Sequence, residues 1–312
     1  MALSISRGPR LRALGIVLYG PEGIGKSTLA SQFPAPVFID LEHGTDTMDV
    51  ARTDTPKSFN DVLNLMMLIA DEEDFKTVVI DTADKLEQLI TAHVLEVHHL
   101  NSIEDAGYGK GYTYVAEEFS KFLRVCGQLI EAGKNVVIVA HAMMRKFEQP
   151  DEMGAYDRWE LKLSKKAAPL VKEWADMVLF LNYKTTVITD DKTKSKKARG
   201  GKRVMYTTHH PAWDAKNRFG LDDELPMEFE AIQQCFVEVP KKKSAYEVIR
   251  EQIEENGISE AEIVEFVRKR DPKLRADAVD LETMPPAYVK YIKENLEKVI
   301  KNILKNKEAS DT

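Results

Sequence analysis

The sequence predicts an α/β fold, in which a mostly parallel sheet is flanked by helices, followed by a small all-helical module. Short apolar runs of strand length alternate with stretches of helical spacing up to residue 239, and only helical patterns follow. Continuous apolar runs are typical of strands that are buried on both faces of a parallel sheet. The 312 residues suit one large domain at 1–239 and a small helical domain at 240–312.

The predicted elements of the first domain, taken in order, support this fold. Five apolar runs read as strands, at residues 14–20, 37–41, 77–81, 136–140 and 177–181. Helical spacing is expected at residues 26–33, 59–70, from 82 to about 100, and 119–131. Residues 101–114, 143–166 and 189–203 interrupt the alternation and are predicted as loops. Loops of that length in a compact domain are usually functional or disordered.

The last 72 residues favour helices throughout. Residues 241–256 read as a helix closed by Gly257, and Ser259 and Glu262 have the spacing of a capping box. Pro285 opens a last predicted helix with one apolar stripe that runs to Ile303.

Composition excludes several classes of protein. The net charge of −7 means that any contact with nucleic acid must come from a local basic patch. The two cysteines, Cys126 and Cys235, lie far apart and form no disulfide framework or zinc motif, so both are predicted to be buried in a reducing compartment. No apolar run has the length of a membrane span, so we expect a cytoplasmic protein with no membrane partner.

A phosphate-binding loop follows the first strand. Residues 20–27 fit the pattern G-x-x-x-x-G-K-[ST], with the strand before it and a helix after it that this motif requires. Backbone N–H groups of such a loop surround phosphates, and the helix N-terminus adds a positive dipole end. The pattern predicts ATP binding by Gly20, Pro21, Glu22, Gly23, Ile24, Gly25, Lys26, Ser27 and Thr28.

Two of these residues have a special role beside the phosphates. Lys26 supplies a charge for the β- and γ-phosphates, and Ser27 supplies a hydroxyl ligand for Mg²⁺. Asp81 ends an apolar strand where a magnesium-organising carboxylate is expected. The alternative for Asp81 is an ordinary aspartate that caps the next helix.

The segment VFIDLEHGTD at residues 37–46 resembles the second strand and following loop of RecA-type recombinases, which read FIDxEHxxD. In that family the glutamate activates the water that attacks the γ-phosphate, which implies this catalytic role for Glu42. The later aspartate lies near the adenine, and Asp46 matches it. A surface Glu-His pair in a loop is the alternative.

Two further matches extend the resemblance. His141 follows the strand VIVAH, where RecA-like proteins carry a polar residue that senses the γ-phosphate; a capping or core-edge histidine is the alternative. Residues 216–220, KNRFG, look like a motif of RadA-type proteins. The resemblance implies that Lys216 and Arg218 act in trans on the ATP of a neighbouring subunit in a homo-oligomeric ring or filament. The alternative is a solvated basic loop.

The whole pattern resembles the RecA-like nucleotide-binding proteins of bacteriophages, including single-strand annealing and recombination proteins. Residues 107–112 (GYGKGY), 156–163 (YDRWELKL) and 172–176 (KEWAD) carry it, and the resemblance covers residues 14–236. It implies a DNA-stimulated ATPase that binds single-stranded DNA in the cytoplasm of the host cell. The helices after residue 240 are a candidate contact for a single-strand-binding or replication protein.

Three segments are candidates for the contact with DNA. In RecA-like cores two loops line the central axis, and here those positions offer aromatic residues and cations that suit base stacking and phosphate contact. The lysine-rich stretch at residues 192–203 adds a third candidate, whose contacts with the phosphate backbone would carry no sequence preference. The alternative is that the aromatics pack on their own loops and the charges are solvated. The candidate residues are Tyr108, Lys110, Tyr112, Arg145, Lys146, Lys196, Lys197 and Arg199.

Two other functions remain open. A helicase-loader-like accessory would use ATP as an assembly switch and form a stoichiometric complex with a protein held by the helical module. A P-loop kinase of small molecules would need an acceptor pocket and a lid, and would leave the pair Lys216 and Arg218 unexplained.

Overall fold

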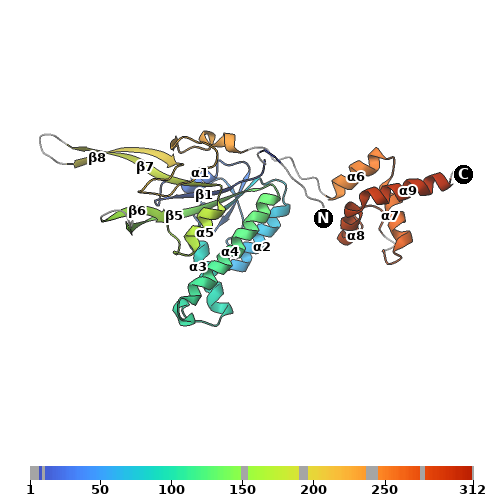
Figure 1. Cartoon of the computed structure of the whole chain (residues 1–312), viewed down its shortest axis with the longest axis horizontal. Helices are drawn as coiled ribbons and strands as arrows, with labels where there is room; N and C mark the ends of the chain where they lie inside the picture. The colour runs from blue at the N-terminus through green and yellow to red at the C-terminus, as the bar shows by residue number, and fades with distance from the viewer. Residues whose placement is uncertain are drawn as a thin grey trace. The chain divides into compact units, whose positions relative to one another are not determined.

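The runs predicted as strands lie in one twisted sheet, shown in the computed structural model of Figure 1. The structure describes residues 7–8, 11–148, 154–189, 196–236, 245–274 and 278–310. In that part of the chain the sheet has nine strands, in the order β3-β2-β4-β5-β1-β7-β8-β9, with β6 paired to β5. The strands are β1 (Gly15–Gly20), β2 (Pro36–Asp40), β3 (Ala51–Arg52), β4 (Thr77–Asp81), β5 (Asn135–Glu148), β6 (Ala155–Leu161), β7 (Met177–Thr189), β8 (Lys196–Tyr206) and β9 (Glu224–Pro226).

Parallel pairing joins β3, β2, β4, β5, β1 and β7, whereas β6, β8 and β9 pair antiparallel. The mostly parallel sheet flanked by helices is therefore confirmed. The helices of this unit are α1 (Lys26–Ala30), α2 (Phe59–Asp71), α3 (Ala83–Val97), α4 (Lys110–Glu131) and α5 (Ala167–Trp174), with the short turns η1 (Ile103–Ala106), η2 (Phe229–Ala231) and η3 (Gln233–Cys235).

Side chains on β1 alternate between two apolar cores. Val17 and Tyr19 belong to the core that the helices α2 to α5 cover, on the lower side of the sheet in Figure 1. Ile16 and Leu18 belong to the opposite core, which is closed by α1 and by residues 221–236. All four side chains are fully buried, because successive side chains of a strand point to opposite faces of the sheet.

The predicted loop at 143–166 is wrong for most of its length. β5 continues to Glu148, and β6 pairs antiparallel with its last residues, Ala142 to Glu148, so the two strands form the β5–β6 hairpin. The prediction failed because this hairpin is largely solvated and carries alternating polar residues in place of a continuous apolar run.

Three further boundaries differ from the prediction. β8 begins at Lys196, inside the predicted loop at 189–203, and η1 and the first turn of α4 occupy much of the predicted loop at 101–114. The last predicted helix is divided at Asn295 into α8 (Pro286–Glu294) and α9 (Leu296–Ser310). A break of this kind leaves the apolar stripe intact and so gives no sign in the hydrophobic period.

Contacts divide the chain into two units, Met1–Val239 and Pro240–Thr312. The second unit contains α6 (Ala245–Glu255), α7 (Glu260–Arg270), α8 and α9, which close an apolar core of their own around Ile249, Phe266 and Ile292. The capping box predicted at Ser259 is present.

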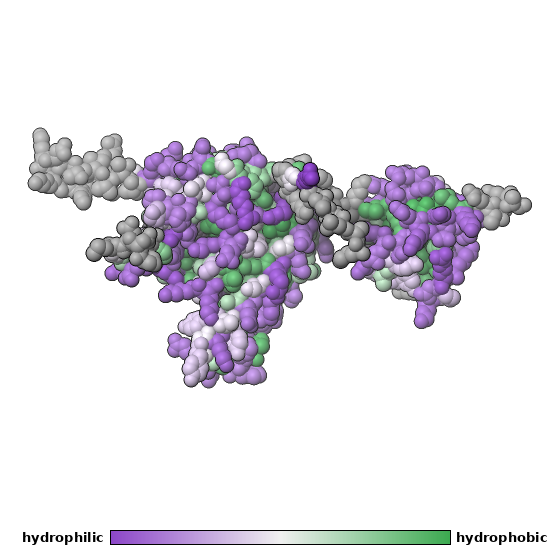
Figure 2. All heavy atoms as spheres, viewed as in Figure 1, coloured by the Kyte–Doolittle hydropathy of each residue, from purple (hydrophilic) through white to green (hydrophobic). Residues whose placement is uncertain are grey.

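Hydrophilic residues cover most of the face of both units seen in Figure 2. Among the described residues, no helix combines the length and the apolar character that crossing a membrane requires. Cys126 and Cys235 are both buried and unpaired, as predicted.

Candidate nucleotide-binding site

The parallel strands bring the predicted site residues to one edge of the sheet. The registers set Gly20 at the end of β1 opposite His141 of β5, and Asp40 at the end of β2 opposite Asp81 of β4. The loops that follow these strands therefore meet at the carboxyl edge, which is where ligands bind in open α/β sheets.

The phosphate-binding loop needs glycine at its start and near its end. A Cβ at Gly20 would lie 2.3 Å from the carbonyl oxygen of Leu181, because β7 passes directly beside the loop. Gly25 has a φ of 104°, in the left-handed region that favours glycine, and it precedes the first residue of α1. Together these positions curl residues 20–27 tightly at the end of β1.

Lys26 lies inside this curl. Its side chain is almost fully buried, and Nζ donates to the carbonyl oxygens of Pro21 at 3.0 Å and Gly20 at 3.3 Å. Burial lowers the pKa of Lys26, although the charges of Asp81 and Asp84 oppose the shift. A phosphate held by the loop would stabilise the ammonium in this position.

Ser27 and Asp81 form a pair that fits Mg²⁺. Ser27 Oγ donates to Asp81 Oδ2 at 2.5 Å, which places a hydroxyl and a carboxylate oxygen side by side at the carboxyl edge. Burial raises the pKa of Asp81 to about 6, and the charges of Asp40 and Glu42 add to the shift while the Ser27 hydroxyl opposes it. A divalent cation would relieve this excess of negative charge, and oxygen ligands are those that Mg²⁺ prefers.

Glu42 is held at the surface of the same edge. Thr82 Oγ1 donates to Glu42 Oε1 at 2.9 Å, and Thr82 directly follows the magnesium candidate Asp81. A carboxylate that is exposed and yet oriented by a hydroxyl can accept a proton from a water molecule beside the γ-phosphate.

Asp40 shapes the loop that carries Glu42. Its carboxylate accepts hydrogen bonds from the backbone N–H of Glu42 at 3.0 Å, of Gly44 at 3.3 Å and of Thr45 at 2.8 Å, and from the Thr45 hydroxyl at 2.5 Å. Burial would raise the pKa of Asp40, but these donors outweigh it and the pKa is lowered. The charged carboxylate thus fixes the backbone from Glu42 to Thr45.

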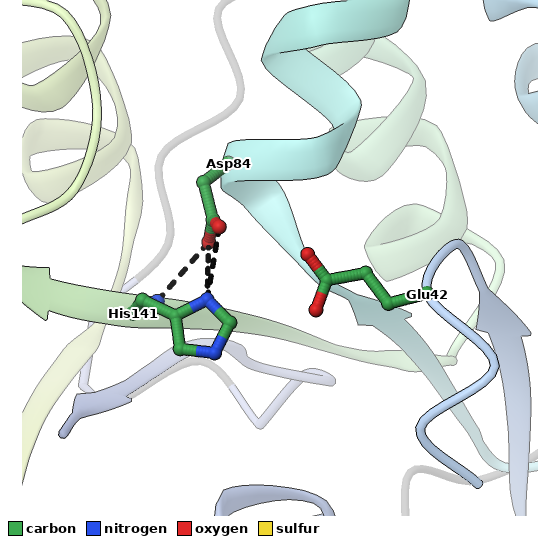
Figure 3. Close-up of side chains that lie close together, drawn as sticks. All are labelled: Glu42, Asp84 and His141. Carbon is green, nitrogen blue, oxygen red and sulfur yellow. Dashed lines mark hydrogen bonds and ion pairs between the residues drawn. The ribbon is translucent and has the colours of Figure 1, made fainter. Parts of the chain in front are cut away.

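His141 is oriented by Asp84 of α3 (Figure 3). The Nδ1 atom lies 2.9 Å from Asp84 Oδ2 and 3.1 Å from Oδ1, and the His141 backbone N–H donates to Oδ1 at 3.1 Å. Burial would raise the pKa of Asp84, but the hydrogen bonds from His141 lower it. An ionised carboxylate at Nδ1 keeps the proton on that nitrogen and leaves Nε2 free to act.

Glu42 and the pair Asp84–His141 lie close together. One ligand atom from each of the three side chains lies within 4.8 Å of the others. The proposed base and the proposed sensor thus share one small volume next to the loop that holds the phosphates.

Asp46 lies apart from this cluster. Its side chain is mostly exposed, and its Oδ2 lies 3.9 Å from Nδ1 of His43 in the same loop. β4 and β5 separate β2 from the strand that carries the phosphate-binding loop. Within the described residues no contact joins Asp46 to that loop, so its role near the adenine stays a prediction.

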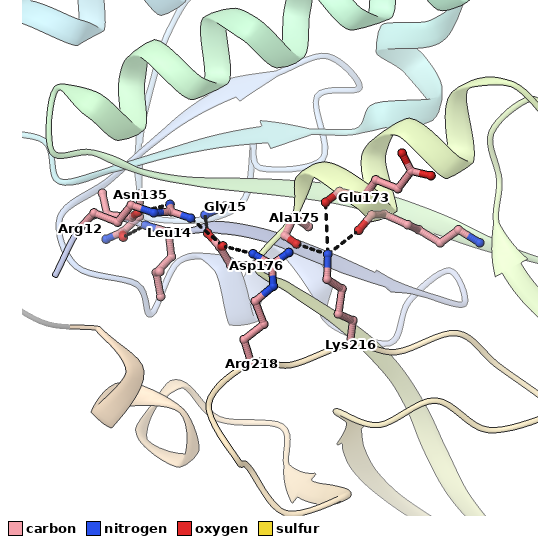
Figure 4. Close-up of polar contacts among 11 residues, drawn as sticks. Arg12, Leu14, Gly15, Asn135, Glu173, Ala175, Asp176, Lys216 and Arg218 are labelled. Atoms are coloured by element: carbon pink, nitrogen blue, oxygen red, sulfur yellow. Dashed lines mark hydrogen bonds and ion pairs between the residues drawn. The ribbon is translucent and has the colours of Figure 1, made fainter. Parts of the chain in front are cut away.

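Lys216 and Arg218 lie at the opposite, amino edge of the sheet (Figure 4). Lys216 Nζ donates to the carbonyl oxygens of Lys172, Glu173 and Ala175 at the end of α5, at 3.0, 3.2 and 2.6 Å. Arg218 pairs at 3.1 Å with Asp176, which also accepts from Arg12 and from the Gly15 N–H.

The length of β1 separates this edge from the loop of the same subunit. Six residues of strand between Gly15 and Gly20 span roughly 17 Å, at about 3.3 Å per residue. Arg218 of one chain therefore cannot contact the phosphates held by that chain.

The residues predicted to contact DNA differ in their exposure and in their hydrogen bonds within the protein. Tyr108 is exposed in the connection between α3 and α4, and Lys110 and Tyr112 are exposed in the first turn of α4, at the end of both helices that is distant from the sheet (Figure 1). Lys146 is exposed on the hairpin, whereas Arg145 donates to the carbonyl oxygen of Leu163 at 2.8 Å. The side chains of Lys196, Lys197 and Arg199 lie outside the part of the chain that the structure describes.

Sequence reasoning missed Asp40, Thr82 and Asp84. Each stands next to or near a predicted residue, but each reads locally as an ordinary strand-end or helix-start residue. Their partners are 2 to 57 positions away along the chain. Only the closing of the sheet brings Asp84 to His141, so no local pattern could have found this pair.

One comparison with known proteins shows the class of domain. A family model described as AAA domain matches residues 12–219. No curated protein gives a significant match. Among solved structures, a KaiC-like protein of the hyperthermophilic archaeon Pyrococcus horikoshii OT3 matches with 16% identity and a TM-score of 0.36, over 62% of this chain and 79% of that chain. At this identity and TM-score, no conclusion about the chain is drawn from the structural match.

Proposed function

Since the chain belongs to the AAA domain family and has the phosphate-binding loop of a P-loop ATPase, we propose that it couples ATP hydrolysis to the binding of single-stranded DNA. The proposed role is recombination or annealing, carried out by a homo-oligomer. The alternation of ATP-bound and released states would order and then free the surfaces that hold the strand.

Hydrolysis rests on residues that the fold gathers at one edge. Lys26 and the loop N–H groups would bind the phosphates, and Ser27 with Asp81 would hold Mg²⁺, which stabilises the charge on the transferring phosphoryl. Glu42 would take the proton of the attacking water while the Thr82 hydroxyl keeps its carboxylate in place.

The continuity of β5 is the observation that carries the coupling to DNA. His141 belongs to this strand, and its side chain lies close to that of Glu42. The same strand runs on to the exposed Lys146 in the β5–β6 hairpin. The backbone N–H of Lys162, just after β6, donates to the carbonyl oxygen of His141 at 2.8 Å. A movement of His141 on loss of the γ-phosphate would therefore shift both strands of the hairpin together.

A second surface favours the same partner. Tyr108 and Tyr112 are exposed on either side of Lys110, an arrangement that allows bases to stack on aromatic rings while a cation meets the phosphate. The segment from Tyr108 to Tyr112 follows the far end of α3, and Asp84 lies in the first turn of the same helix, so α3 connects this surface to the nucleotide site.

One observation favours a loader-like accessory instead. The unit Pro240–Thr312 closes its own apolar core, as a module that binds a separate protein would. In that case ATP would act as an assembly switch, and a single-strand-binding or replication protein would occupy the helical unit.

The test is ATP hydrolysis by the full chain with and without single-stranded DNA. We expect stimulation by DNA in the wild type and loss of at least about 100-fold in Lys26→Ala and Glu42→Gln. Lys26→Ala should also lose nucleotide binding, whereas Glu42→Gln should retain it. Hydrolysis that ignores DNA, in a protein that does not bind the strand, would refute the proposal; a stoichiometric protein complex would then favour the loader, and transfer to a small acceptor would favour a kinase.

A further inference from the structure

The strands β7 and β8 continue past the phosphate-binding loop. Pairing between β1 and β7 ends at Tyr19 and Phe180, but β7 runs on to Thr189 with β8 beside it. The carbonyl oxygen of Leu181 closes against Gly20, and Tyr183 Oη lies 3.5 Å from the carbonyl oxygen of Gly23. The hairpin therefore forms one wall of the nucleotide loop.

Arg203 points from this wall to the middle of the loop. It is the register partner of Tyr183, and directly opposed residues of an antiparallel pair project from the same face. A Cβ at Gly25 would lie 3.1 Å from Nη1 and 3.8 Å from Cζ of Arg203. The guanidinium thus occupies the space beside the glycine that precedes Lys26, where a side chain would otherwise lie.

No acceptor neutralises this guanidinium within the described ranges. The side chain of Arg203 is exposed, and no carboxylate or carbonyl oxygen of the described residues lies within hydrogen-bond or ion-pair distance of it. Nearby cations differ: Lys184 is paired with Glu224 at 2.7 Å, and Lys26 donates to carbonyl oxygens of the loop. A guanidinium presents up to five N–H donors in a planar fork that matches phosphate oxygens.

We propose that Arg203 binds phosphate oxygens of the nucleotide held by its own subunit, as a second cation beside Lys26. The proposal deepens the proposed function and depends only on its nucleotide-binding part. Arg203 would supply a contact in cis that Lys216 and Arg218 cannot reach in the same chain. It would also make the position of the β7–β8 hairpin depend on the phosphates in the loop.

The test measures binding of ATP and of inorganic tripolyphosphate to the full chain in the absence of DNA. Arg203→Ala should weaken both ligands by about 10- to 100-fold, and Arg203→Lys should fall in between because it keeps the charge without the fork. Lys202→Ala is the matched control, since the neighbouring residue of a strand points to the other face, and it should leave both affinities within about twofold.

Thermal unfolding separates binding from folding. Without ligand, Arg203→Ala should melt with the wild type, since the side chain is exposed, and its stabilisation by ATP should shrink. An affinity within about twofold of the wild type would overturn the proposal, as would a loss confined to ATP with tripolyphosphate unchanged, which would assign Arg203 to the nucleoside. Because DNA is absent from these measurements, a hydrolysis that ignores DNA would refute the DNA proposal and leave this one standing.

Discussion

Carboxylates at the carboxyl edge of the sheet take different charge states because their hydrogen-bond donors differ. Asp40 and Asp84 each receive several N–H or O–H donors, which keep them ionised despite burial. Burial raises the pKa of Asp81, and the charges of Asp40 and Glu42 add to the rise, because the single hydrogen bond from the Ser27 hydroxyl is too weak to offset them. The first two therefore act as fixed anchors, and the third is the carboxylate whose charge depends on what binds beside it.

Binding of Mg²⁺ should depend on pH through Asp81. A proton occupies this carboxylate increasingly as the pH falls below about 6, so the affinity for Mg²⁺ in the presence of ATP should fall by up to about tenfold from pH 6 to pH 5. Asp81→Asn should bind Mg²⁺ weakly at every pH. Titration of wild type and variant at the same pH values isolates the residue, since protonation of ATP itself affects both alike; equal pH profiles would contradict the assignment.

The titration of Asp81 affects folding stability with the opposite sign: lower pH weakens Mg²⁺ binding but favours the folded state. A carboxyl whose pKa rises from 3.8 to about 6 on folding contributes stability fully below pH 3.8, and that contribution is lost as the pH rises through about 6. Bound Mg²⁺ would reverse this dependence, because it favours the ionised form.

At the scale of elements, strands with two buried faces could be predicted from the sequence, whereas the solvated strands of the β5–β6 hairpin could not. β1 and β4 are continuous apolar runs that end in a glycine and an aspartate, and both features are visible in the sequence. The β5–β6 hairpin carries polar residues on both strands, and cross-strand contacts such as Arg145 with Glu160 and Phe147 with Tyr156 join its two strands in place of a continuous apolar run. The position of Arg203 beside Gly25 and the pairing of Asp84 with His141 could not be predicted for a related reason, because each joins elements that are distant in the sequence.

The β5–β6 hairpin and the segment from Tyr108 to Tyr112 can be tested as separate DNA-binding elements. Lys146→Glu and Lys110→Glu should each weaken binding of single-stranded DNA by about 10-fold or more at low salt, because each replaces an attraction to phosphate by a repulsion. Fluorescence anisotropy with a labelled oligonucleotide gives the affinity. Lys121→Glu on α4, where the lysine pairs with Glu118, is the control for net charge. If a variant binds like this control, the corresponding element does not hold the strand.

At the scale of the whole molecule, Lys216 and Arg218 could contact a nucleotide only if a neighbouring subunit held it, because they lie at the edge of the sheet opposite their own phosphate-binding loop. Substitution of Lys216 is a poor test of action between subunits, because the loss of its three hydrogen bonds at the end of α5 would itself cost about 1–3 kcal/mol of folding stability. Arg218 is more exposed, and Asp176 keeps Arg12 as a partner without it.

Mixing two inactive variants tests catalysis between subunits. Arg218→Ala and Lys26→Ala should each lack activity as pure oligomers. At equal amounts, roughly a quarter of the interfaces would join an intact loop to an intact Arg218, so hydrolysis should return to about that share of the wild type. The subunits must be mixed under conditions that let them exchange, which a wild-type spike confirms. Absence of recovery under exchange would refute action in trans.

The separate cores of the two units also bear on how such a chain can change over evolutionary time. Each unit is closed by its own apolar residues, so a substitution inside the four-helix core is not constrained by the packing of the sheet. A gene could exchange the segment after residue 240 for another module, and acquire a new binding partner, while the nucleotide machinery was inherited unchanged.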